Sequence, residues 1–168
     1  MSKKKWKLYL AGGLFNAGER LHITFLEMDL KDLGYEVISP MREAFERFDS
    51  DSGKFDLEAV VGDCREAASS TDNLYVGCID GADVDGGTAV EYGMAIASTG
   101  RAVVYRTDFR TAIDREVGIN SMFSCERTEL IYSPCFFTEI KDALLYYREL
   151  ALQIHEKVSL LVQDENKI

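Results

Sequence analysis

Residues 73–97 read NLYVGCIDGADVDGGTAVEYGMAIA, and this stretch decides the fold. Its first part, 74–79, is an apolar run too short for a helix, so it predicts a strand. An acidic turn with glycines follows, and small residues that favour helices begin after the turn. The stretch therefore predicts a strand, a loop and a helix. In open α/β sheets, ligands bind beyond the carboxyl ends of the strands, so the functional site is expected at the acidic turn and the helix start.

The same alternation continues through the rest of the chain. Further strands are predicted at 7–11, 35–39, 101–105 and 130–132, and further helices at 18–33, 56–70 and 138–161. Strands and helices that alternate with short connections indicate a parallel sheet. We therefore expect an α/β fold: a doubly wound, flavodoxin-like parallel sheet of about five strands with helices on both faces. Residues 41–55 are polar and mixed, and they predict a long loop over the site, with room for one short helix.

Composition narrows the class of protein. The chain has 168 residues, 46% of them apolar, and only two prolines, so we expect a single domain over 1–168. Its 29 acidic and 19 basic residues give a net charge of −10, which disfavours nucleic acid and anionic membranes as partners. No run approaches 18 apolar residues and no signal peptide is recognisable, so we expect a cytoplasmic protein. The cysteines and histidines lack ligand spacing, so neither a metal nor another cofactor is expected.

Glu91 is the strongest candidate for a catalytic residue. A carboxylate in the first turn of a helix faces the positive end of the helix dipole, which favours the anionic form at neutral pH. Such a group can attack an anomeric carbon or stabilise an oxocarbenium-like transition state. However, the pattern from Thr88 to Glu91 is also that of a capping box, in which the glutamate only bonds the cap amide. Spacing alone leaves both interpretations open.

The acidic turn before this helix contains Asp80, Asp83 and Asp85. Carboxylates on a loop are most often solvated, and this is the favoured interpretation of Asp80 and Asp83. A loosely held divalent cation is the alternative, although the EF-hand pattern is absent.

Several motifs, taken in order, resemble the nucleoside 2-deoxyribosyltransferase family. They are LYLAGGLF at 8–15, Asp63 before an apolar strand, DGGTAVEYGMA at 85–95, and NSM at 120–122. The resemblance implies that 2-deoxyribose is transferred between nucleobases by a retaining double displacement. It also implies that Glu91 is the nucleophile that forms a covalent glycosyl-enzyme.

The resemblance assigns roles to seven further residues. Tyr9 would orient Glu91, Asp85 would hold the sugar or assist proton transfer, and Asp63 would be the acid-base group near the nucleobase. Gly12 and Phe15 would line the pocket, Asn120 would reach the 5′ end of the sugar, and Met122 would pack beside it. Three of them have a simpler alternative: Tyr9 would pack in the core, Asp85 would cap the helix, and Asp63 would be an exposed helix carboxylate.

Three functions remain open from the sequence. The first is the transferase, with a deoxynucleoside and a free nucleobase as its small-molecule partners. The second is an N-glycosidase that hydrolyses 2′-deoxynucleosides or their 5′-monophosphates, although the amide of Asn120 and the acidic loop favour a free 5′-hydroxyl. The third is a non-catalytic nucleoside-binding module or a flavodoxin-like signalling module. The helix predicted at 138–161 is apolar on more than one face, which together with the family position of Asn120 predicts a homo-oligomer with sites shared between subunits.

Overall fold

The computed structural model describes residues 6–109, 119–134 and 136–165. Five parallel strands form the main sheet, in the order β2-β1-β5-β6-β7. The strands are β1 (Lys7–Ala11), β2 (Glu36–Ile38), β5 (Asn73–Cys78), β6 (Ala102–Arg106) and β7 (Thr128–Tyr132). This order confirms the doubly wound fold. The chain winds outward in one direction from β1 to β2 and in the other from β5 to β7, so the loops after β1 and β5 separate and leave a crevice between them.

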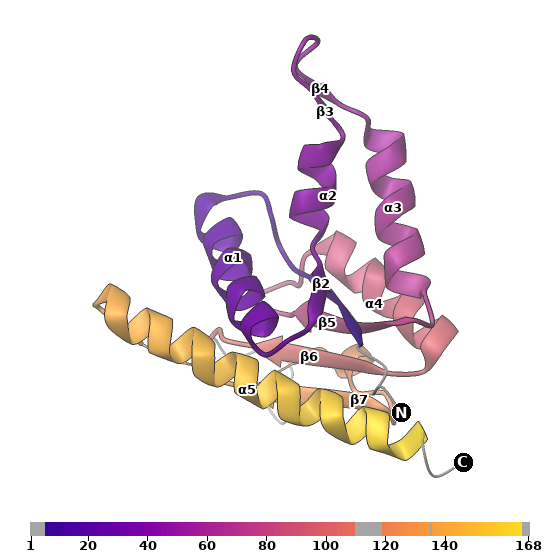
Figure 1. The fold of residues 1–168 in the computed structure, drawn as a ribbon. Helices are drawn as coiled ribbons and strands as arrows, with labels where there is room; N and C mark the ends of the chain where they lie inside the picture. The colour runs from indigo at the N-terminus through magenta and orange to yellow at the C-terminus, as the bar shows by residue number, and fades with distance from the viewer. Residues whose placement is uncertain (1–5, 110–118, 135, 166–168) are drawn as a thin grey trace.

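Helices cover both faces of the sheet, as the alternation predicts (Figure 1). The helices α1 (Ala17–Asp32) and α5 (Ile140–Glu165) pack on one face, against alternate residues such as Leu8 and Leu74. The helices α3 (Leu57–Ser69) and α4 (Gly86–Thr99) pack on the other, against Tyr9 and Val104. Tyr9 is therefore on the face of the sheet that carries α4. None of the helices in the described ranges is long and apolar enough to cross a membrane.

The segment expected to be a long loop is more ordered than predicted. It contains the short helix α2 (Pro40–Glu46) and a hairpin of two strands, β3 (Phe48–Asp49) and β4 (Lys54–Phe55). Pro40 was expected only to end the preceding strand, but it is also the first residue of α2, where a fixed φ suits the helix and a missing N–H costs nothing. In Figure 1, α2 and the hairpin project beyond the sheet beside α3.

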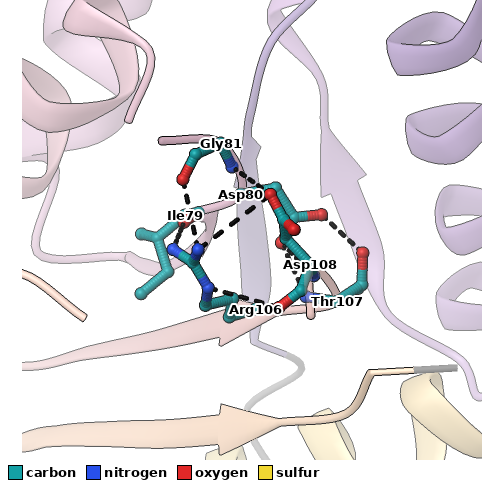
Figure 2. Close-up of polar contacts among 6 residues, drawn as sticks. All are labelled: Ile79, Asp80, Gly81, Arg106, Thr107 and Asp108. Atoms are coloured by element: carbon teal, nitrogen blue, oxygen red, sulfur yellow. Dashed lines mark hydrogen bonds and ion pairs between the residues drawn. The ribbon is translucent and has the colours of Figure 1, made fainter. Parts of the chain in front are cut away.

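A polar network fixes the loop that follows β5 (Figure 2). The carboxylate of Asp80 accepts hydrogen bonds from the amides of Thr107 (2.6 Å) and Asp108 (2.9 Å) and from the Thr107 hydroxyl (2.5 Å). The guanidinium of Arg106 donates to the carbonyls of Ile79 (3.1 Å) and Gly81 (3.2 Å). The interpretation of Asp80 as a solvated carboxylate is therefore wrong, because Asp80 joins the ends of β5 and β6. Asp83 is exposed, as expected.

Candidate active site

A cavity of about 470 Å³ opens at the carboxyl ends of β1 and β5. This volume falls in the range of sites for small organic ligands. The loop after β1 and the start of α4 form one side, and α2, the hairpin and α3 form the other. The lining residues are Gly12, Leu14, Phe15, Arg20, Pro40, Met41, Ala44, Phe45, Phe55, Leu57, Val60, Cys64, Asp85, Gly87, Thr88 and Glu91. The wall is mostly apolar, with the carboxyl groups of Asp85 and Glu91 at one side.

The start of α4 differs from the expected capping box. Asp85 is the N-cap residue, and its Oδ2 accepts hydrogen bonds from the amide (2.8 Å) and the hydroxyl (3.0 Å) of Thr88. Glu91 is consequently in the second turn of the helix, too far along to reach the cap amide. The capping-box interpretation of Thr88 and Glu91 is therefore wrong, and the carboxyl of Glu91 faces the cavity instead.

Burial dominates the electrostatics of Glu91. Removal from water raises the pKa of its carboxyl to about 7; the nearby Tyr9 hydroxyl lowers the pKa, and the charge of Asp85 raises it. The expectation of a fully anionic group at neutral pH, drawn from the helix dipole, is thus wrong. The dipole acts mainly over the first turn, and Glu91 lies beyond it in a partly buried position. Near pH 7 the carboxyl is about half ionised.

The side chain of Tyr9 rises from β1 beneath this carboxyl. It is 1% exposed, and its hydroxyl makes no hydrogen bond of standard geometry within the described chain. Burial raises the pKa of Tyr9 far above its usual value, and the nearby charge of Glu91 raises the pKa further. The hydroxyl therefore keeps its proton, and it lies close enough to Glu91 to act as a donor to the anionic carboxylate.

Gly12 and Phe15 lie in the cavity wall, where the resemblance places them. A Cβ at Gly12 would come within 3.0 Å of Ile23 Cδ1 and 3.2 Å of Cys78 Cβ, so a larger residue would displace the loop or these neighbours. Phe15 is 83% exposed at the mouth of the cavity. Such a ring is available to stack on a bound base or to contact a neighbouring chain.

The structure does not bring Asp63 into this cavity. Asp63 forms an ion pair with Arg47, with Oδ2 at 2.9 Å from Nε and 2.8 Å from Nη2. It lines a neighbouring cavity of about 400 Å³, which also contains Tyr9. Cys64, the next residue along α3, lines both cavities. Asp63 therefore does not line the cavity that contains Glu91.

Asn120 and Met122 also lie away from Glu91 in this chain. Met122 belongs to the 3₁₀ turn η1 (Ser121–Phe123), and Asn120 is its N-cap, whose Oδ1 accepts a hydrogen bond from the Met122 amide at 3.0 Å. Neither residue lines the cavity, both are exposed, and Met122 is 75% exposed. Of the eight candidate site residues predicted from the sequence, the structure therefore brings five together within one chain: Tyr9, Gly12, Phe15, Asp85 and Glu91.

Sequence reasoning missed the cation in the cavity wall. Arg20 is the only lysine or arginine among the residues described as lining the cavity, and its Nη1 donates to the Leu14 carbonyl at 3.0 Å. The sequence feature that could have indicated this role is an arginine one turn after the helix cap Asn16, next to a glycine-rich loop.

Sequence reasoning also missed Glu27, which is fully buried although it is charged. Its signal was a glutamate among the apolar positions Ile23, Leu26 and Leu30 of α1.

The family model described as nucleoside 2-deoxyribosyltransferase matches residues 8–162. No curated protein matches the sequence. A conserved protein from Enterococcus faecalis V583 is 19% identical, with a TM-score of 0.56 over 86% of this chain and 98% of that one. A 2-deoxyribosyltransferase from Bacillus psychrosaccharolyticus is 24% identical, with a TM-score of 0.55 over 82% of this chain and 90% of that one.

Proposed function

Because the chain belongs to the nucleoside 2-deoxyribosyltransferase family, we propose that it moves 2-deoxyribose from one nucleobase to another. The observation that carries this proposal is the setting of Glu91. Its carboxyl group is partly buried in the wall of a largely apolar cavity, beside the Tyr9 hydroxyl. A helix carboxylate with only a structural role would instead be exposed or fully paired, because burial of an unpaired charge is costly.

In the first proposed step, a carboxylate oxygen of Glu91 attacks the anomeric carbon of a deoxynucleoside. The bond from this carbon to the base nitrogen breaks, its electrons leave with the base, and the base takes up a proton. Asp85 is the second carboxyl group in the cavity, so we assign the proton transfer to Asp85 rather than to Asp63. A deoxy sugar lacks the electron-withdrawing 2′-hydroxyl, which makes positive charge at the anomeric carbon easier to develop.

In the second step, a nitrogen of another base attacks the same carbon and releases Glu91. Two successive inversions retain the configuration of the sugar. Asp85 would take back the proton that the incoming base loses. Water competes with the second base for the intermediate, so exchange requires a cavity that is closed and largely apolar.

The direct test is incubation with thymidine and adenine, followed by chromatography. We expect 2′-deoxyadenosine and thymine as products, and no turnover by Glu91→Gln. With thymidine alone, mass spectrometry should find one deoxyribosyl group attached to the peptide that contains Glu91. A protein that releases neither exchanged nucleoside nor free base would refute the proposal and would favour a non-catalytic binding module.

Arg20 supports a second candidate, the hydrolysis of a 2′-deoxynucleoside 5′-monophosphate. A guanidinium in the wall can pair with a phosphate dianion, which the carboxylates of Asp85 and Glu91 would otherwise repel. The two candidates differ in their preferred substrate. If the second is correct, thymidine 5′-monophosphate will be cleaved faster than thymidine, and Arg20→Ala will remove that preference while leaving the cleavage of thymidine intact.

We also propose that the enzyme is a homo-oligomer whose cavities are completed by neighbouring subunits. Phe15 at the mouth of the cavity and Met122 on η1 are both largely exposed apolar side chains. The outer side of α5 adds Leu144, Leu145 and Leu152. Apolar side chains of this kind, aromatic residues and methionine above all, are enriched at interfaces between subunits. Sedimentation analysis of Met122→Glu tests this proposal, because a charge in an interface should shift the protein toward smaller species.

A further inference from the structure

The helix α2 forms one wall of the cavity, through Pro40, Met41, Ala44 and Phe45. It has only seven residues and does not pack on the main sheet (Figure 1). A helix this short is not stable by itself, so its position depends on contacts with its neighbours. The question is what holds this wall in place.

Two pairs of arginine and carboxylate hold α2 at its two ends. Arg47, at the end of α2, pairs with Asp63 on α3, and both side chains are partly exposed. Arg42, near the start of α2, places its Nε 2.5 Å from Oε1 of Glu27 on α1. Exposed pairs contribute little because water and salt screen them. The pair with Glu27 is different, because that carboxylate is buried.

The side chain of Glu27 is 0% exposed. Lys31, one turn later on the same helix, contacts the same Oε1, and Oε2 makes no hydrogen bond within the described ranges. A buried carboxylate cannot exchange its partner for water without a large loss of free energy. Arg42 is the partner that comes from another element, so this charge-assisted bond ties α2 to α1 across the side of the cavity.

We propose that Glu27 is a positioning residue, which holds α2 closed over the cavity through Arg42 and thereby keeps water from the glycosyl-enzyme. This inference rests on the proposed function for its catalytic consequence. If α2 moves outward, water reaches the glycosyl-enzyme more often, and the rate of hydrolysis increases relative to the rate of base exchange. Attack by Glu91 itself depends on β1 and α4, which the pair does not touch.

Lys31 provides a matched control. Lys31→Ala and Arg42→Ala each remove one positive charge from the same oxygen of Glu27, but only Arg42 links α1 to α2. Arg42→Lys is a third variant, which keeps the charge and loses the planar donor group. Circular dichroism and thermal unfolding verify that each variant is folded.

The first readout does not require activity. Cys64 lines both of the cavities that α2 borders, so its alkylation by iodoacetamide reports how firmly α2 covers it. Peptide mapping by mass spectrometry separates Cys64 from the other cysteines. We expect alkylation of Cys64 to become roughly tenfold faster in Arg42→Ala, the effect of losing one charge-assisted hydrogen bond, and to stay unchanged in Lys31→Ala. Arg42→Lys should lie between wild type and Arg42→Ala.

The second readout is the ratio of hydrolysis to exchange with thymidine and adenine. We expect this ratio to rise several-fold in Arg42→Ala, together with the KM for adenine, while the rate of thymine release changes little. Equal alkylation rates in Arg42→Ala and wild type, or equal acceleration in Lys31→Ala, would overturn the inference. A wild-type protein that turns over no substrate would refute the proposed function, and the alkylation rates would still decide whether Glu27 holds α2.

Discussion

The burial of Glu91 predicts that the proposed nucleophile destabilises the fold above neutral pH. The pKa of the carboxyl moves from its ordinary 4.5 in the unfolded chain to about 7 in the folded one. Between these values the folded state binds more protons than the unfolded state, so the free energy of unfolding falls as the pH rises through this window. The full loss of unfolding free energy is about 3 kcal/mol, because each unit of difference between the two pKa values corresponds to about 1.4 kcal/mol.

Glu91→Gln removes this dependence, because the amide resembles the protonated carboxyl and cannot ionise. Relative to wild type, the variant should gain about 2 kcal/mol of unfolding free energy between pH 5 and pH 8. Urea denaturation of both proteins at several pH values measures this difference. Glu66→Gln, a substitution at an exposed position of α3, is the control and should show no such trend. A Glu91→Gln variant that is less stable than wild type at pH 8 would show that the carboxylate is satisfied in the fold, and the reasoning would fail.

Three further predictions follow from the same site. The rate of thymine release should rise as the pH increases through about 7. In Tyr9→Phe this rise should move to higher pH, because the Tyr9 hydroxyl lowers the pKa of Glu91. A pH profile that does not move would show that Tyr9 does not act on Glu91. Asp85→Asn should keep the helix cap and the stability of the fold but lose activity. Asp85→Ala should lose activity and also about 1 kcal/mol of unfolding free energy, measured by urea denaturation. Asp80→Ala should lower the free energy of unfolding by about 2 kcal/mol or more, because three hydrogen-bond donors lose their acceptor. Asp83→Ala, at an exposed position of the same loop, should change the free energy of unfolding by less than about 0.5 kcal/mol.

The fold could be predicted because its signals are local. The strand at 74–79 and the periodic helices around it were recognisable from short windows, and Gly100 ends α4 in a left-handed conformation, with φ of 67°. The helix α2 was less visible, because Pro40 is compatible with both a strand end and a helix start. The cap of α4 was ambiguous for a similar reason. Asp85 and Thr88 are both good caps, and the two glycines between them also suit a turn.

The site could be predicted only in part, because its properties depend on contacts between distant segments. The hydrogen bonds of Asp80 come from residues 27 and 28 positions later, and no local pattern predicts them. The pKa of Glu91 depends on its burial where α4 packs against α3, whereas the sequence showed only a carboxylate near a helix start. The pairing of Asp63 with Arg47 likewise depends on the approach of α2 to α3. The neighbourhood of Glu91, Tyr9 and Asp85 was predictable, because loops after adjacent parallel strands meet at one edge of a sheet.

The hairpin beyond α2 is closed at its base by a single backbone hydrogen bond, from the Asp56 amide to the Arg47 carbonyl at 3.0 Å. The chain therefore leaves and re-enters the body of the protein at nearly the same point. A replacement segment that joins these two positions would leave the main sheet in place, because neither strand of the hairpin pairs with that sheet. Since Phe55 of this hairpin lines the cavity, exchange of the segment is a way to reshape the cavity wall without altering the sheet.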